Sequence, residues 1–253
     1  MTFKKKIIFA AVISFVMVVI AVTGFYIKSP ELFNCFVINF SQNFSEAGEN
    51  LYISNDTPVS LKDSIISVLN NADKRVCKFW DVNKRIGNPV IIFCFSKDKL
   101  KSYNKNNRIA THKTPFKSFV VFYKDCINLD ILSHELSHAE LCARIGYFKN
   151  VKIPVWFDEG LAMQVDYRKE YSEEKYRELK DSDSMNINLS SISEPAEFYS
   201  GNYYYHFILA KHEVSTWIKS LKQDELDNFL NQIKNGEDFY SVYEASRKSL
   251  LFK

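Results

Sequence analysis

The segment His134-Glu135-Leu136-Ser137-His138 combines the residue types of a metal site with a residue for acid–base catalysis. Two histidines four positions apart lie on one face of a helix, so their imidazole rings can converge on a single Zn²⁺. The glutamate after the first histidine leans toward a water at such a site, where a carboxylate can act as a general base. We therefore predict His134 and His138 as zinc ligands and Glu135 as the general base of a hydrolytic reaction.

A catalytic zinc site has three protein ligands and one open position. Glu159 is the candidate third ligand, because it lies near the start of a second expected helix in the segment PVWFDEGLA. Twenty residues separate it from His138. Two histidines and a glutamate with an open position favour zinc over other metals, and we expect one Zn²⁺ per chain.

HELSH followed at this distance by WFDEGLA resembles the gluzincin branch of the zinc metallopeptidases, which includes thermolysin and the aminopeptidase N family. The similarity is greatest to small bacterial peptidase-MA-like domains and extends over about residues 50 to 250. It implies a zincin-like fold in which His134, His138 and Glu159 bind zinc and Glu135 is the base. It also implies that the strand expected at Phe116–Lys124 is the edge along which an extended peptide adds.

The sequence departs from this family in three places. The gap of 20 residues between His138 and Glu159 is near, but not identical, to that of the aminopeptidases or of thermolysin. Thermolysin-like proteins carry a carboxylate four residues after the ligand glutamate to orient a histidine, and this chain has Met163 there. Asp158 and Asp166 are the alternatives for that role. The aminopeptidase segment G-x-M-E-N, whose glutamate holds a free amino terminus, does not occur in this sequence, which favours internal cleavage or a highly restricted substrate.

Attack of water on a peptide carbonyl produces an oxyanion, and a hydrogen-bond donor is needed to stabilise it. In the aminopeptidase branch this donor is a tyrosine on a later helix, and the segment GNYYYHF offers Tyr203, Tyr204, Tyr205 and His206. We select Tyr203. The alternative for each of these residues is an aromatic helix face that packs in the core.

Residues 7–27 carry no charge, and a helix of that length, rising about 1.5 Å per residue, crosses a hydrocarbon core about 30 Å thick. A cleaved signal peptide is the less favoured alternative, because its apolar region would be shorter. Three lysines at 4–6 against Lys28 alone predict a cytoplasmic N-terminus and an extracytoplasmic domain, periplasmic or extracellular. The expected organisation is a cytoplasmic tail at 1–6, an anchor at 7–27, a juxtamembrane stalk with the first strands at 28–57 and a zincin-like metallopeptidase domain at 58–253.

Charge and cysteine content exclude other classes of protein. The chain has 33 Lys and Arg against 30 Asp and Glu, and the three lysines before the anchor account for the difference. A nucleic-acid partner would require a basic surplus, so none is expected. Five cysteines cannot all pair, and without a CxxC spacing we expect most of them to be buried apolar residues. Cys142 is accordingly expected to pack rather than bind metal, and His112 and His212 to lie on the surface.

Periodicity and the resemblance together predict an α+β fold: one transmembrane helix, a small mixed sheet, an active-site helix and a helical C-terminal part. Strands are expected at Phe33–Phe40, Leu51–Ser54, Val90–Phe95 and Phe116–Lys124, with a loop at Asn104–Thr114. Helices are expected at Leu61–Trp80, with Ser60 as its N-cap, and at Ser96–Tyr103 and Asn128–Arg144. Further helices are expected after Pro154, within Arg168–Asp183, whose charged residues would form a solvated face, and through most of the last 55 residues, with a break at 235–238.

Two functions fit these features. The first is a membrane-anchored zinc metallopeptidase that acts on peptides or proteins outside the cytoplasm. The second is a non-catalytic protein that uses the same scaffold to hold a peptide or a partner protein. Retention of Glu135 favours the first, because a scaffold has no use for a general base. Substrate specificity and oligomeric state are not predicted.

Overall fold

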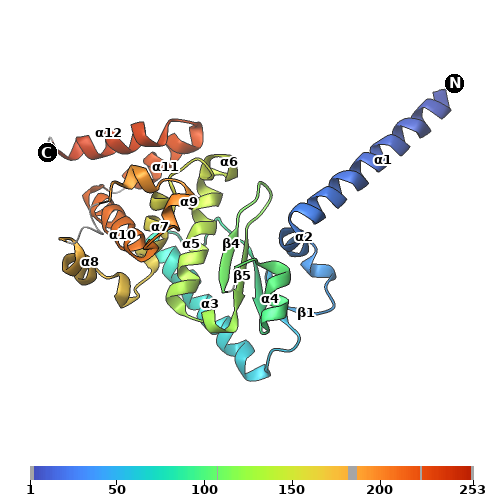
Figure 1. The fold of residues 1–253 in the computed structure, drawn as a ribbon, viewed down its shortest axis with the longest axis horizontal. Helices are drawn as coiled ribbons and strands as arrows, with labels where there is room; N and C mark the ends of the chain where they lie inside the picture. The colour runs from blue at the N-terminus through green and yellow to red at the C-terminus, as the bar shows by residue number, and fades with distance from the viewer. Residues whose placement is uncertain (1–2, 107, 182–186, 223, 252–253) are drawn as a thin grey trace.

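The computed structural model describes residues 3–106, 108–181, 187–222 and 224–251. The described part is an α+β fold, in which a small mixed sheet is covered by helices and continues into a helical C-terminal part (Figure 1). One long apolar helix extends away from the rest of the molecule. The predicted α+β class with a mixed sheet and a single N-terminal apolar helix is confirmed.

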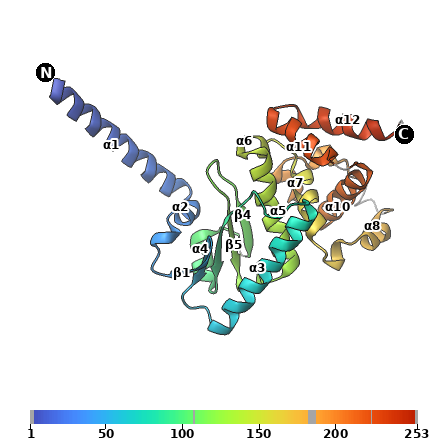
Figure 2. The ribbon, with the colours of Figure 1, turned by 180° about the vertical axis from the view of Figure 1, so that it is seen from behind.

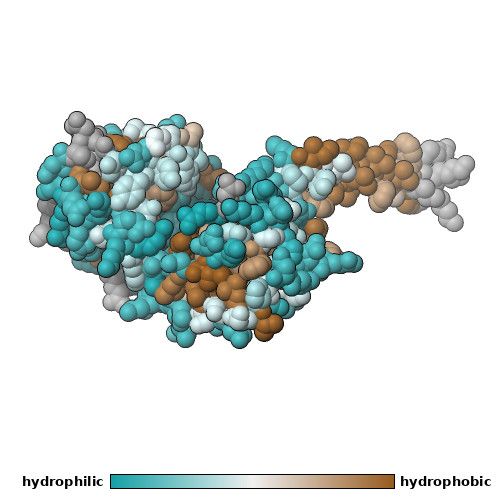
Figure 3. Space-filling view, turned by 60° about the horizontal axis from the view of Figure 1, so that its bottom comes forward, coloured by the Kyte–Doolittle hydropathy of each residue, from teal (hydrophilic) through white to brown (hydrophobic). Residues whose placement is uncertain are grey.

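Helix α1 (Phe3–Lys28) contains the predicted anchor. Its segment Phe9–Lys28 is long and apolar enough to cross a membrane, and none of it is buried. Figure 3 shows the coloured part of the protruding helix mostly in brown, which marks hydrophobic residues, whereas the domain surface is mainly teal and white with a smaller brown patch. Residues 1 and 2 of the predicted tail lie outside the described residues, and α1 already includes residues 3 to 6.

The predicted strand at Phe33–Phe40 is wrong, because this segment forms helix α2 (Pro30–Phe36) and a 3₁₀ turn, η1 (Ile38–Phe40). Only Ser29 separates α2 from α1. Pro30 stands at the start of α2, where its fixed φ suits a helix and its missing N–H costs nothing. The rings of Phe36 and Phe119 lie 5.0 Å apart, so α2 packs on the sheet. The predicted stalk is therefore attached to the domain by a helix.

The sheet has the strand order β1-β2-β3-β5-β4. Strands β2, β3 and β5 run parallel, and β1 and β4 add antiparallel at the two edges. The bounds are β1 (Phe44–Gly48), β2 (Leu51–Ser54), β3 (Val90–Cys94), β4 (Ile109–His112) and β5 (Phe119–Tyr123). The strands predicted at Leu51–Ser54 and Val90–Phe95 are thus confirmed.

The strand expected as the free edge is an inner strand. Every residue of β5 is buried, and it pairs with β3 on one side and β4 on the other. A run of five apolar residues needs cover on both faces, which an edge position does not give. The edge strand next to β5 is β4, which lies in the predicted loop Asn104–Thr114 and whose residues are all half-buried. The edge assignment implied by the family resemblance therefore moves from β5 to β4.

Helices cover both faces of the sheet. On one face α3 (Val59–Phe79) and α5 (Leu129–Ile145) share a core with Ile53, Phe93 and Phe122. On the other, α2 and α4 (Lys97–Tyr103) share a smaller core with Ile92 and Val121. Helices α3, α4 and α5 match the predicted ones, except that α3 begins after Pro58 and takes no cap from Ser60, whereas α2 replaces the predicted strand.

The C-terminal part is helical, as predicted. Gly236 ends α11 in the left-handed region, which glycine adopts without a steric penalty, and this agrees with the predicted break at 235–238. Ser182 and Asp183 of the predicted charged stretch lie outside the described residues. The helices are α6 (Tyr147–Asn150), α7 (Val155–Ala162), α8 (Glu173–Leu179), α9 (Pro195–Phe198), α10 (Tyr203–Ser220), α11 (Glu225–Asn235) and α12 (Phe239–Leu251), with 3₁₀ turns η2 (Lys124–Cys126), η3 (Met163–Val165), η4 (Lys169–Tyr171) and η6 (Leu189–Ile192).

All five cysteines are buried as free thiols. Burial raises the pKa of the Cys94 thiol to about 12, so it stays protonated at neutral pH. Cys142 is among the buried residues of α5. The expectation that the cysteines serve as apolar core residues is confirmed.

Close packing of α7 on α10 depends on Gly160. A Cβ at this position would lie 2.5 Å from the carbonyl oxygen of Ala210 and 2.6 Å from Cγ2 of Val214. We expect Gly160→Ala to lower the free energy of unfolding by about 1–3 kcal/mol, because a helix backbone cannot give way cheaply.

Thermal unfolding in the presence of a chelator, which removes any contribution from bound metal, measures this effect. Gly48→Ala is the control, since its Cβ would only meet Leu51 Cβ at 3.9 Å. Equal transition temperatures for the two variants would contradict the proposed tight contact.

Candidate metal centre

Helix α5 places the two histidines of HELSH on one face. The Asn128 side chain caps its first turn by accepting hydrogen bonds from the backbone N–H groups of Asp130 and Ile131, at 2.8 and 3.2 Å. This fixes where the helix begins and so which residues turn inward. His134 and His138 are both buried, and their ring centroids lie 4.7 Å apart.

Helix α7 brings Glu159 to the same point. The helix begins after Pro154, and its Trp156 and Phe157 side chains are buried in the core. The helix packs against both α5 and α10, so it is buried on most of its sides. Glu159 is only 6% exposed there, which is unusual for a carboxylate without a compensating charge.

The three predicted ligands meet around one point. His134 Nε2 lies 3.1 Å from Glu159 Oε2 and 3.1 Å from His138 Nε2, and His138 Nε2 lies 3.5 Å from Glu159 Oε2. Tetrahedral ligands at about 2.0–2.2 Å from a zinc ion lie about 3.3–3.6 Å from one another. The observed separations are within about 0.2 Å of that range. This buried group of residues could hold a metal ion.

Each histidine has an aspartate beside its other ring nitrogen. His138 Nδ1 lies 2.8 Å from Asp158 Oδ1, and Lys113 pairs with the second oxygen of that carboxylate. His134 Nδ1 lies 3.8 Å from Asp166 Oδ2. A carboxylate that is hydrogen-bonded to this nitrogen fixes the tautomer and orientation of a ligand histidine, as Asp158 does for His138, whereas the buried His134 Nδ1 has no hydrogen-bond partner among the described residues.

The sequence left Asp158 and Asp166 as alternatives for this role, and the structure places one beside each histidine. Arg168 Nε holds both oxygens of Asp166, at 2.9 and 3.0 Å. Met163, at the position where the family has its carboxylate, is fully buried.

The centre carries an excess of negative charge. The two outer aspartates have cationic partners, whereas Glu135 and Glu159 have no Lys or Arg within salt-bridge distance among the described residues. Burial opposes ionisation of Glu159, but His138 and a hydrogen bond from His134 outweigh it and hold the pKa of this carboxyl well below its usual value. Burial likewise opposes charge on His138, but Asp158 and Glu159 raise its pKa. The centre thus attracts positive charge, which a proton or a metal ion can supply.

Glu135 lies beside the three donors at the floor of a cleft of about 860 Å³. Its Oε2 accepts a hydrogen bond of 2.6 Å from Thr111 Oγ1 on edge strand β4. The cleft is lined by β4, by α5 and α7 and by the segment from Pro195 to Phe207. Sequence reasoning missed Thr111, because the β4 region was expected to be a loop.

Tyr199 is a second residue that sequence reasoning missed. Its hydroxyl donates a hydrogen bond to Glu159 Oε1 from the end of α9. Burial and the nearby carboxylates raise the pKa of Tyr199, so the hydroxyl keeps its proton. The only signal in the sequence was that Tyr199 lies just before the aromatic segment GNYYYHF, four residues before Tyr203.

The four residues considered from GNYYYHF take different positions. Tyr203 lines the cleft and is 52% exposed. The Tyr204 hydroxyl donates to the carbonyl oxygen of Glu170, and His206 Nδ1 lies 2.6 Å from the carbonyl oxygen of Phe198. Both side chains therefore have hydrogen-bond partners other than the three predicted metal ligands. Tyr205 is half-buried and does not line the cleft.

The histidines expected on the surface are both half-buried. His112 Nε2 lies 3.0 Å from the carbonyl oxygen of Tyr103, and burial lowers the pKa of His112. The His212 ring stacks on Tyr176 at 3.5 Å between centroids. Neither belongs to the cluster of metal donors.

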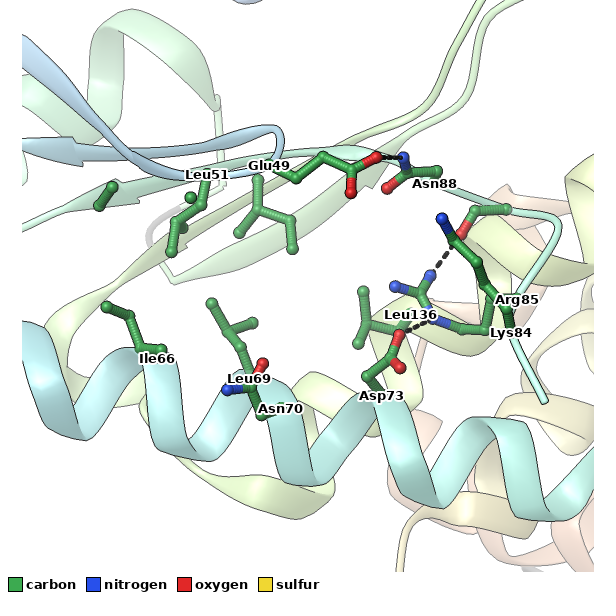
Figure 4. A pocket seen from close by; sticks show the side chains of 14 residues that line it. Glu49, Leu51, Ile66, Leu69, Asn70, Asp73, Lys84, Arg85, Asn88 and Leu136 are labelled. Atoms are coloured by element: carbon green, nitrogen blue, oxygen red, sulfur yellow. Dashed lines mark hydrogen bonds and ion pairs between the residues drawn. The ribbon is translucent and has the colours of Figure 1, made fainter.

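A smaller cavity of about 290 Å³ lies between α3, the β1–β2 turn and residues 84–88 (Figure 4). Leu51, Ile66 and Leu69 form its apolar floor, and a salt bridge of 2.5 Å between Arg85 and Asp73 closes one side. None of the three donors lines this cavity. The chemistry therefore belongs to the larger cleft.

Searches against protein-family models, curated proteins and solved structures find no match to this chain. The centre is accordingly interpreted from its own residues and their geometry.

The hydrogen bond from His138 to Asp158 predicts an effect on metal affinity. We expect Asp158→Asn to weaken zinc binding by about 10- to 100-fold, since an amide orients the imidazole poorly and adds no charge. Competition with a chelating dye measures the affinity. The exposed Asp63 on α3 gives the matched control Asp63→Asn, and equal affinities for both variants would show that Asp158 does not support the site.

Proposed function

We propose that the chain is a zinc-dependent metallopeptidase of the gluzincin type, anchored to a membrane by α1. The observation that carries this proposal is the convergence of His134, His138 and Glu159 with Glu135 beside them at the floor of a cleft. Two neutral nitrogens and one carboxylate oxygen form a donor set that suits zinc. A bound zinc ion would supply a Lewis acid that polarises water and a peptide carbonyl.

Glu135 is the general base in this proposal. Its carboxylate lines the cleft and is held by Thr111, so it can take a proton from water and pass it to the leaving amine. Glu159 cannot play this part, because both of its oxygens are engaged with the histidines and Tyr199. The division of roles follows from the partners of each carboxylate.

Tyr199 is the proposed donor to the oxyanion. Its protonated hydroxyl lines the cleft and donates to Glu159 Oε1, a hydrogen bond that it would exchange for one to the oxyanion, whereas Tyr203 lines the cleft and is half-exposed. Tyr203 remains the other candidate. A donor in this position stabilises charge that develops in the transition state.

The proposed substrate is a peptide or protein segment in an extended conformation. Strand β4 pairs with β5 on one side and has no strand partner on the other among the described residues. Ile109, Ala110 and Thr111 line the cleft, so a peptide added to the free edge would pass the three donors. The lysines at 4–6 support an orientation that places this cleft outside the cytoplasm.

Hydrolysis of peptides by the zinc-loaded chain tests this proposal. We expect Glu135→Gln to lower kcat by at least about 100-fold, because it removes the proton acceptor. The same variant should keep its zinc, since Glu135 is not one of the three donors.

The outcome separates the two functions considered from the sequence. A wild-type chain that binds zinc and an extended peptide but cleaves none of a broad peptide library would support the non-catalytic alternative. Cleavage that persists in Glu135→Gln would contradict the proposed role of this residue.

Kinetics can also distinguish the two tyrosines. We expect Tyr199→Phe to lower kcat by about 100-fold or more with little change in KM, as for loss of an oxyanion donor. Tyr203→Phe should have a much smaller effect. The opposite ranking would assign the donor role to Tyr203.

A further inference from the structure

Three segments that are distant in sequence meet on one face of the domain. They are residues 84–89, the β4–β5 hairpin at 113–118, and residues 146–152, which include α6. A shallow depression is lined by residues from all three, among them Ile86, Phe116 and Tyr147. We call these three segments together the hairpin face.

The hairpin face exposes large apolar side chains. Their exposed fractions are 85% for Phe116, 68% for Phe148, 63% for Ile86 and 57% for Val151. Single exposed apolar residues are ordinary on a protein surface, but several on one face indicate contact with another apolar phase.

The hairpin face is also basic. Its three segments, KRIGNP, KTPFKS and GYFKNVK, contain six Lys and Arg and no Asp or Glu. Arg85 and Lys113 are paired with aspartates, at Asp73 and Asp158. The other four lysines, at 84, 117, 149 and 152, have no salt bridge within the described residues. Lys84 lines the cavity beside α3 and Lys149 Nζ lies against Gly236 at the end of α11, which leaves Lys117 and Lys152 for this face. Lysines around exposed aromatic and aliphatic side chains are typical of surfaces that lie on anionic lipid.

The hairpin face lies beside the end of the apolar helix α1. The ring of Phe25 in the last turns of α1 lies 6.1 Å from that of Phe36 in α2, and Phe36 lies 6.4 Å from Phe116 at the hairpin tip. In both ribbon views, α2, the hairpin tip and α6 form a row that runs across the direction of α1 (Figures 1 and 2). A bilayer that contains α1 would therefore meet this face of the domain.

We propose that the hairpin face docks on the anionic phospholipid surface of the same bilayer that α1 enters. Phe116, Phe148 and Val151 insert among the headgroups, and Lys117 and Lys152 contact lipid phosphates. Because α2 packs on the sheet, the domain is held against the bilayer by two attachments rather than by a flexible tether.

Docking also bears on the substrate, in a step that rests on the proposed function. Lys113 lines the catalytic cleft and lies only three residues from Phe116. One end of the cleft thus lies next to the lipid surface. This favours cleavage sites in chain segments close to the bilayer.

Tryptophan quenching in the full chain tests the docking without reference to activity. The three native tryptophans, at 80, 156 and 217, are buried, so a tryptophan introduced by Phe148→Trp reports on the hairpin face. Position 148 is preferable to 116, which lies close to α2. The chain is placed as one copy per lipid nanodisc that contains phosphatidylglycerol, with or without bromine atoms near the headgroup end of the acyl chains.

We expect bromine to lower the emission contributed by Phe148→Trp, and Lys117→Glu with Lys152→Glu to abolish that quenching. Lys169→Glu with Lys180→Glu is the control of equal charge, because η4 and α8 lie at the end of the domain far from α1 (Figure 1). Quenching should persist in this control. Equal emission in brominated and plain discs would overturn the proposal. Equal emission is also the result expected if a second copy of the chain, rather than lipid, covered the face. Quenching unaffected by the Lys117 and Lys152 changes would overturn its electrostatic part.

Discussion

The burial of an ionised glutamate between two histidines is the constraint on which the site depends. Glu159 is taken out of water by the packing of α7 against α5 and α10, and a buried carboxylate is costly unless positive charge meets it. His138 supplies that charge when it is protonated, and a metal ion can replace the proton. Gly160 allows this packing, because α10 passes where a larger residue would place its Cβ. The packing of α7 on α10 that completes the core therefore also positions Glu159, the third predicted metal ligand.

The sheet contributes to the site through its edge. Strand β4 is stabilised by pairing with the buried strand β5 and carries Thr111, which donates a hydrogen bond to Glu135. Lys113, which directly follows β4 in the hairpin, forms a salt bridge with Asp158. The edge therefore positions the proposed base and one outer carboxylate, and it leaves a free side where a peptide can add. Because this hairpin also carries the exposed Phe116, the proposed catalytic cleft and the proposed lipid contact share one structural element.

Much of this arrangement could be predicted from the sequence. Helix α5 has a clear N-terminal cap and helical periodicity, and the HELSH motif predicts which of its faces carries the metal ligands. Pro154 and the two aromatic residues after Val155 predict helix α7. Strand β4 could not be predicted, since IATH has a weak strand pattern and forms only by pairing with β5. The segment Phe33–Phe40 is apolar enough for a strand or a helix, and contact with Phe119 decides for α2. Tyr199 reaches Glu159 only because α9 ends where it does, which no spacing reveals.

The proposed reaction requires a metal ion held by three side chains. The measurement that tests it is the metal content of the purified full chain by mass spectrometry, next to Glu159→Ala prepared in the same way. We expect about one zinc per chain in the parent and markedly less in the variant. A chain that contains no metal and takes up none when zinc is added would contradict it.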